Sequence, residues 1–164
     1  MWSYAATVFC ICATGCVVAE DLEAIARSIV DESRFMALGT ADGAGTPWVS
    51  PVWYAPASYR DYIWVSRQDT RHSRSIARRP EVAVVIYDSH RPGGWAAIYM
   101  TGTAAEIQDV DGALAVFNRT SAAHGLRPWS GAEVSAESEY RLYGMVVSDQ
   151  YVLDGHDRRH PVRL

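Results

Sequence analysis

Short apolar runs joined by connections of hairpin length constrain the fold of this chain more than any other feature. Strand-like runs occupy residues 34–40, 46–55 and 60–66, and Asp42-Gly43 falls between the first two as a hairpin signal. Connections this short join antiparallel strands, whereas parallel strands need a crossover of a dozen or more residues. We therefore expect a mostly β fold in which an antiparallel sheet closes into a small barrel, with helices packed outside.

The rest of the chain is predicted by the same patterns. Helices are expected at residues 20–33, 70–79 and 109–125, and further strands at 81–88, at 95–108 and as two strands within 139–155 around Ser148-Asp149. The run 81–88 is continuously apolar, which predicts burial on both faces. Gly102 suggests a bulge in its strand, and residues 126–137 are expected to be irregular.

Length and charge limit the classes of protein that the chain can belong to. With 164 residues, the chain suits one domain, which we place at residues 19–164. A net charge of -4 leaves no basic excess for neutralising phosphates, so a nucleic-acid partner is not expected. All 15 basic residues are Arg, which is typical of a GC-rich, bacterial genome.

Residues 1–18 form an apolar leader of uncertain status. The leader holds all three cysteines and lacks the positive charge that begins a signal peptide, since the first basic residue is Arg27. It can be a start placed too far upstream, a buried N-terminal segment or a targeting signal, and the first reading is favoured. We expect a cytoplasmic protein with no membrane partner and no disulfide framework.

Standard catalytic and metal-binding motifs are missing from the sequence. Neither a glycine-rich phosphate loop, a Gly-x-Ser-x-Gly elbow nor a His-Glu-x-x-His pair occurs, and the histidines are scattered without metal-ligand spacing. No metal site is therefore expected, and the catalytic residues stay unknown. A bound cofactor would carry any chemistry.

The helix predicted at residues 70–79 begins with an unusual charge pattern. Arg71, His72 and Arg74 crowd its first turn, although a helix N-terminus favours acidic neighbours. An anion held by these side chains would make the arrangement favourable, and Ser66 at the end of the preceding strand could direct its hydroxyl to the same point. The alternative is a basic helix that simply faces solvent.

The strand "WVSPVWY", residues 48–54, alternates two sets of side chains across its faces. One face could line a slot for an aromatic ring while the other packs the core. Aromatic residues at alternate strand positions are usually core residues, so this pattern is a weak signal by itself.

Three segments, taken in order, resemble the pyridoxamine 5'-phosphate oxidase-like family of FMN-binding split barrels. They are "FMALGTADGAGTPWVSPVWYA", "DYIWVSRQDTRHSRSIARRPEVAVVIYD" and "WAAIYMTGTAAEI". The resemblance covers about residues 22–107 well. It implies a six-stranded antiparallel split barrel that forms a homodimer, with FMN at the subunit interface. It also implies cofactor-binding positions at Ser50, Pro51, Val52, Trp53, Val65, Ser66, Arg71, His72 and Arg74, and a loop around Trp129 and Ser130 that approaches the flavin of the other subunit.

Departures from the family pattern bear on the substrate. Pyridoxamine phosphate oxidases carry Arg-x-Val-Leu-Leu-Lys where this chain has the uncharged residues 50–55, and His72 stands where Lys is usual. Arg158-Arg159-His160 is similar to the family's C-terminal Arg-x-His substrate clamp, although the tail is rich in Arg in any case. The resemblance therefore implies a family member with a different, unassigned small-molecule substrate.

An FMN-dependent oxidoreductase is the leading expectation from this resemblance. A reductase that uses the deazaflavin F420 is the nearest alternative, with Arg78, Arg79 and Arg91 available for a longer anionic tail. A heme-using relative is more distant, because no histidine lies in a recognisable heme-ligand motif. A non-catalytic flavin-binding protein remains open as a different class.

Overall fold

The structure, a computed structural model, describes residues 21–87, 96–154 and 156–164. The leader expected at residues 1–18 and the loop predicted at 90–94 lie outside these residues. The elements are α1 (Leu22–Glu32), β1 (Phe35–Ala41), β2 (Pro47–Trp53), β3 (Ala55–Pro56), β4 (Asp61–Arg67), α2 (Arg71–Ile76), β5 (Glu81–Tyr87), β6 (Ala97–Glu106), α3 (Val110–Ala123), the 3₁₀ helix η1 (Gly131–Val134), β7 (Tyr140–Leu153) and β8 (Arg159–Pro161).

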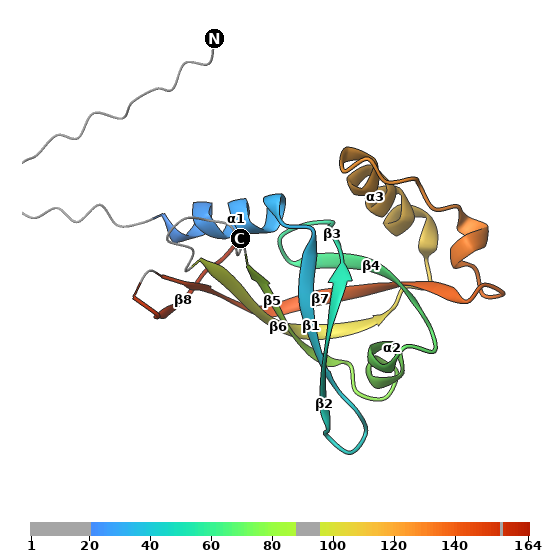
Figure 1. Ribbon diagram of the computed structural model, residues 1–164, viewed down its shortest axis with the longest axis horizontal. Coiled ribbons are helices and arrows are strands. Elements are labelled where there is room, and N and C mark those ends of the chain that lie inside the picture. The colour runs from blue at the N-terminus through green and yellow to red at the C-terminus, as the bar shows by residue number, and fades with distance from the viewer. Residues whose placement is uncertain (1–20, 88–95, 155) are drawn as a thin grey trace, which may run out of the picture.

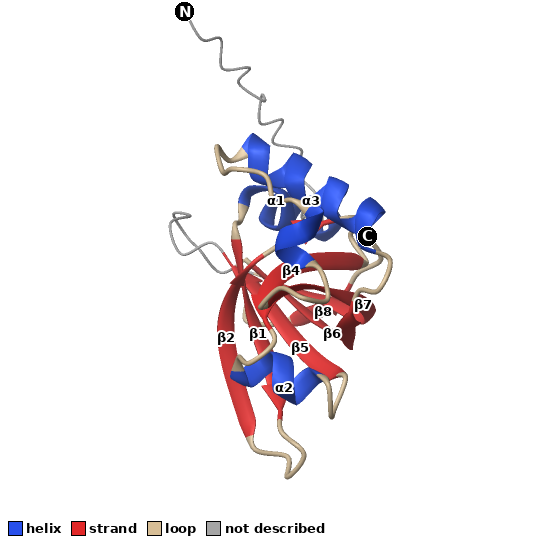
Figure 2. Ribbon diagram, turned by 90° about the vertical axis from the view of Figure 1, so that its right-hand side faces the viewer, coloured by secondary structure: helices blue, strands red, loops and turns tan. Residues whose placement is uncertain are grey.

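One curled antiparallel sheet dominates the fold, as Figures 1 and 2 show. Its strand order is β2-β1-β5-β6-β7-β4-β3, and β8 pairs with β7. The expected mostly β architecture with flanking helices is confirmed, but the expected count of six strands is wrong, because the described residues form eight. The short β3 and β8 account for the difference, since each forms only where a neighbouring long strand offers an open edge.

The inner face of the curled sheet holds the main core. Alternate residues of each strand point inward, and they meet the apolar side of α1, where Ala26, Ile29 and Val30 are buried. Trp64 and Tyr143 stack inside with ring centroids 5.8 Å apart. This packing places α1 over one end of the sheet, while α2 lies beside the β1–β2 hairpin at the other end (Figures 1 and 2).

Helix α3 covers a different part of the sheet. Leu114 and Phe117 on α3 pack with Ile63 of β4 and Leu142 of β7, residues that belong to a second core cluster on the outer face. The same cluster takes in Val134 of η1. None of the helices in the described part of the chain is long and apolar enough to cross a membrane.

Strand β7 corrects the prediction of two strands around Ser148-Asp149. It is continuous from Tyr140 to Leu153, and its register with β6 shifts between Thr101 and Gly102. Thr101 pairs with Asp149 and Gly102 pairs with Val147, so Ser148 is the extra residue of a β-bulge. The bulge expected near Gly102 therefore exists, but the strand opposite Gly102 carries the added residue and continues through it.

Strand β5 corrects a second prediction, because it is buried on one face only. Val82, Val84 and Ile86 are buried, whereas Ala83 and Tyr87 are exposed. The outer face of β5 is apolar in sequence but receives no helix from the described residues, since α3 packs on β3, β4 and β7 instead. An apolar run therefore did not imply cover on both sides.

Candidate functional site

Helix α2 begins with one side facing solvent and the other facing the sheet. Thr70 is its N-cap, and the Thr70 hydroxyl accepts the N–H of Ser73 at 3.3 Å. Arg71 and Arg74 are exposed, whereas His72 is buried. Because successive helical residues turn by about 100°, the three basic residues of this turn divide between solvent and the protein interior.

The imidazole of His72 joins three hydroxyl groups from separate segments. Its Nε2 lies 2.7 Å from Ser66 Oγ and 3.2 Å from Thr70 Oγ1, and its Nδ1 lies 3.1 Å from Ser50 Oγ. His72 is 8% exposed and Ser66 9%. Burial lowers the pKa of His72, so the imidazole is neutral at neutral pH. We call Ser50, Ser66, Thr70 and His72 the hydroxyl–imidazole cluster.

Arg71 and Trp48 extend this cluster toward solvent. The Trp48 indole N–H donates to Ser50 Oγ at 3.0 Å, and the Arg71 guanidinium lies over the Trp48 ring, 4.4 Å from its centroid. The contact holds the exposed Arg71 beside the cluster. A cationic, donor-rich corner results where β2, the end of β4 and α2 meet.

The β1–β2 turn closes one side of this corner. The Asp42 carboxylate accepts the N–H groups of Ala44 and Thr46 at 3.0 and 2.9 Å. The bond from Thr46 is the main cause that holds the pKa of Asp42 below its usual value, and Arg71 adds a smaller effect. Gly45 in this turn has φ +87°, which a glycine adopts without strain.

Other expected cofactor-binding residues lie elsewhere in the fold. Pro51 is exposed on the outer face opposite Ala37, whereas Val52 is buried on the inner face. Trp53 packs at a ring-centroid distance of 4.9 Å from Phe117 of α3. The strand run expected to contact the flavin therefore alternates between two faces, as the period of two requires.

Val65 and Trp129 also belong to the outer side. Both pack against the cluster beneath α3, and Trp129 contacts Tyr140 with ring centroids 5.1 Å apart. The structure thus brings Ser50, Ser66, Arg71 and His72 together. It places Trp53, Val65 and Trp129 in a separate aromatic and apolar group.

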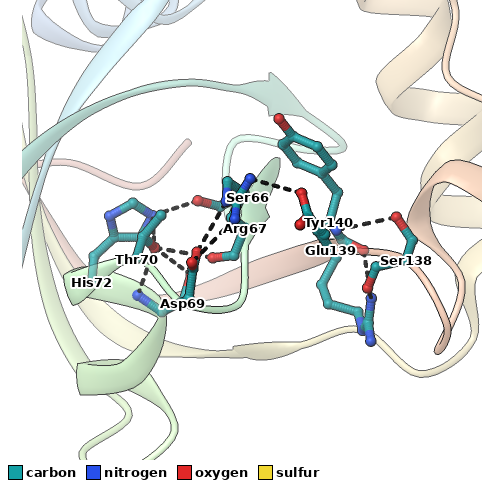
Figure 3. Close-up of polar contacts among 10 residues, drawn as sticks. Ser66, Arg67, Asp69, Thr70, His72, Ser138, Glu139 and Tyr140 are labelled. Carbon is teal, nitrogen blue, oxygen red and sulfur yellow. Dashed lines mark hydrogen bonds and ion pairs between the residues drawn. The ribbon is translucent and has the colours of Figure 1, made fainter.

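An ion-pair bridge links the turn after β4 to the segment before β7 (Figure 3). Arg67 Nε lies 3.0 Å from Asp69 Oδ1, and Arg67 Nη1 lies 2.7 Å from Glu139 Oε2. These groups are exposed, so each pair contributes little to stability.

Two members of the corner were missed by sequence reasoning. Thr70 was expected only as the first residue of the helix predicted at 70–79, and Trp48 only as part of one face of a strand. The period of two places Trp48 on the same face as Ser50, which is the signal that could have revealed it. No such signal exists for Thr70, because its contact with His72 depends on the bend of the turn.

The C-terminal segment similar to a substrate clamp is engaged within the chain. His160 Nε2 lies 2.7 Å from Asp154 Oδ2, and the Arg159 guanidinium lies 4.6 Å from the Tyr99 ring centroid. No group of three or more His, Cys, Asp or Glu side chains suited to a metal ion occurs in the described ranges.

Comparison with protein families gives one match. A family model described as pyridoxamine 5'-phosphate oxidase matches residues 22–145, which include every member of the hydroxyl–imidazole cluster. No curated protein sequence matches the chain.

Solved structures of similar fold include proteins of different described functions. A heme binding protein from Mycobacterium smegmatis has a TM-score of 0.69 and 21% identity, over 89% of this chain and 59% of that protein. The heme storage protein HutZ from Vibrio cholerae has a TM-score of 0.65 and 17% identity, over 84% and 99%. A protein of the pyridoxinephosphate oxidase family from Clostridium acetobutylicum has a TM-score of 0.63 and 13% identity, over 88% and 96%. At these identities the likeness is one of fold.

Proposed function

We propose, from the premise that this chain belongs to the pyridoxamine 5'-phosphate oxidase family, that it is an FMN-dependent oxidoreductase acting on a small organic molecule. Its curled antiparallel sheet with flanking helices is the split barrel of that family. Bound FMN supplies hydride exchange at its N5 atom, and the protein binds and orients the ring.

The observation that carries this proposal is the hydroxyl–imidazole cluster beside Arg71. Phosphate oxygens accept hydrogen bonds from hydroxyl, imidazole and guanidinium groups, and the corner gathers these donor types from β2, β4 and α2. Ser50, Ser66, His72 and Arg71 would hold the FMN phosphate. Arg74 is exposed on the same helix and adds positive charge nearby.

A homodimer with the flavin at the interface completes the proposal. The part of the outer face that no helix of the described residues covers carries exposed apolar side chains on adjacent strands, with Phe35 59%, Val49 62% and Tyr87 59% exposed. Contiguous exposed apolar surface of this kind marks a protein–protein contact more often than a surface facing solvent. A second copy covering this face would enclose the flavin ring beside Pro51.

The test is a flavin titration of the purified protein and of two variants. Arg71→Ala should weaken FMN binding by about 1.5–3 kcal/mol, roughly 10- to 150-fold, because one charge-assisted contact to the phosphate is lost. Arg119→Ala, which removes an exposed arginine from α3, is the matched control and should leave the affinity unchanged. A wild-type protein that binds no FMN at micromolar concentration contradicts the proposal.

The alternative deazaflavin F420 is separated by competition in the same titration. Arg78 and Arg79 flank the β1–β2 turn near Gly43 and Gly45, whereas Arg91 lies outside the described residues. Displacement of FMN by F420 at lower concentration would favour the deazaflavin. Bound FMN that neither nicotinamide reduces, together with no turnover of any amine or enone, would favour a non-catalytic flavin-binding protein.

Heme binding is the second candidate function. Two proteins of similar fold are described as heme-binding and heme storage proteins. In this chain His124 lies edge-on to Trp53 with ring centroids 6.2 Å apart, and among the described residues its imidazole has no hydrogen-bond partner. A Soret band on adding hemin, lost in His124→Ala, would support heme; its absence beside tight FMN binding would exclude this candidate.

A further inference from the structure

The number of hydrogen bonds that the hydroxyl–imidazole cluster can donate to a ligand depends on the charge of His72. A neutral imidazole donates one hydrogen bond and accepts one, whereas an imidazolium donates two. Ser50 already accepts the Trp48 indole N–H at 3.0 Å. The Thr70 hydroxyl has its own acceptors in Arg67 O at 3.1 Å and Ser73 Oγ at 2.8 Å.

With a neutral His72, one serine proton at most is left to donate to a ligand. If the ring proton is on Nε2, it is donated to Ser66, and the Ser50 hydroxyl donates to Nδ1; the Ser66 proton is then left. If the ring proton is on Nδ1, it is donated to Ser50. The Ser66 hydroxyl then donates to Nε2, because it lies 2.7 Å away, whereas Thr70 Oγ1 lies 3.2 Å away and has closer acceptors of its own; the Ser50 proton is then left. In either tautomer, one of the two hydroxyls is used by the ring.

With a protonated His72, both serine hydroxyls become donors. Both ring nitrogens then donate to the serine oxygens, so the protons of Ser50 and Ser66 turn to the ligand together. A positive charge is added at the same place, next to Arg71. Two O–H donors and two cations match a phosphate dianion, which has three terminal oxygens and binds best to charge-assisted donors.

The free protein holds His72 in its neutral state. Burial is the cause that lowers the pKa of His72. The surrounding ionisable groups are Arg71 and Arg74 on α2, the Arg67–Asp69 pair on the turn after β4, Asp42 on the β1–β2 turn and Tyr143 on β7. A dianion at the cluster would be the group that favours the imidazolium.

We propose that His72 takes up one proton when the phosphate of a bound flavin docks at the hydroxyl–imidazole cluster, so that cofactor binding is linked to pH. This inference rests on the proposed function. His72 is here a positioning residue, because its charge decides how many hydroxyl donors Ser50 and Ser66 present. Affinity should be highest at low pH and fall about tenfold per pH unit between the pKa of His72 in the free protein and its higher pKa in the complex.

The experiment is calorimetric titration of the full chain with FMN and with riboflavin, which lacks the phosphate. Titrations at pH 7.5 in two buffers of different ionisation enthalpy give the number of protons taken up. We expect about one proton for FMN and none for riboflavin. FMN affinity between pH 6.5 and 8.5, where the ligand phosphate is mainly a dianion, should fall as the pH rises.

His72→Gln is the matched variant, because a glutamine amide donates and accepts like a neutral imidazole but does not titrate. It should bind FMN without proton uptake and with a flat pH profile. FMN binding without proton uptake in the wild type, or with equal uptake in His72→Gln, overturns this inference and leaves the proposed function standing. If the wild-type protein binds neither FMN nor riboflavin, this inference and the proposed function are both overturned. If His72→Gln does not fold, the FMN–riboflavin difference in the wild type decides.

Discussion

At the scale of the residue, Gly102 shows how closely two strands approach at the bulge of β7. A Cβ added at Gly102 would lie 2.2 Å from the carbonyl oxygen of Val146, closer than any real contact. This nearest atom belongs to the backbone, which cannot rotate away as a side chain could. Glycine is therefore required at this position by packing, not by an unusual backbone conformation.

Gly102→Ala should destabilise the protein by about 1–3 kcal/mol, because the added methyl group forces β6 and β7 apart. Gly112→Ala is the matched control, since a Cβ there meets nothing within 4 Å and the residue lies within α3. The control should stabilise by about 0.5–1 kcal/mol through the higher helix propensity of alanine. Urea denaturation measures both, and equal midpoints for the two variants would contradict the prediction.

At the scale of the element, the segment carrying Trp129 depends on a capping arrangement around η1. Glu133 accepts the Ser130 N–H at 2.8 Å and pairs with Arg127 at 2.7 Å. The Arg127 guanidinium is the main cause that lowers the pKa of Glu133 to about 2, and the Ser130 donors add to it. The carboxylate thus supports a segment whose Trp129 is also held to α3 by two hydrogen bonds with Asn118.

The pH dependence of this element follows from the direction of the Glu133 shift. The folded-state pKa of Glu133 is about 2 and its usual value is 4.5. The contribution of its carboxylate to the stability of the fold is therefore present above about pH 4.5 and is lost as the pH falls toward 2. Titration of the Glu133 carboxyl carbon by NMR should show its inflection near 2. Arg127→Gln should move that inflection upward, and an inflection near 4.5 in the wild type would refute the assignment.

At the scale of the whole molecule, the outer face of β1, β5 and most of β2 is the part of the sheet that no helix of the described residues covers. Helix α3 covers the part of the outer face formed by β3, β4 and β7, and it also reaches Trp53 at the end of β2. Tyr87 and Val49 therefore stay exposed on the opposite part of the sheet, although their sequence is as apolar as that of the core strands. A second copy of the chain is the partner that we propose for this face.

Tyr87→Glu should convert a proposed dimer into a monomer, because a buried unpaired carboxylate opposes association. Leu126→Glu is the matched control. Leu126 is 49% exposed and lies outside the sheet, so this change should leave the molar mass of the assembly in solution unchanged. Sedimentation equilibrium over a range of concentrations measures both. A wild-type protein that is monomeric at every concentration tested would contradict the proposal.

The sequence alone was enough to predict most elements and part of the candidate site. Hairpin-length connections predicted the antiparallel sheet, and the basic turn at Arg71 and His72 pointed to the corner where Ser50 and Ser66 meet. The predictions failed where distant segments decide the outcome. The number of strands depended on the edges offered to β3 and β8. The continuity of β7 depended on its pairing with β6 on both sides of the bulge at Ser148.

Periodicity determined which residues share a face, because side chains alternate along a strand and turn by about 100° along a helix. It could not determine which face is covered, since that depends on where the rest of the chain packs. Tertiary structure alone left β5 bare on one side and turned His72 inward while its neighbour Arg71 faced solvent. The residue types of the candidate site can thus be read from the sequence. Their environments are decided by contacts between segments that are far apart along the chain.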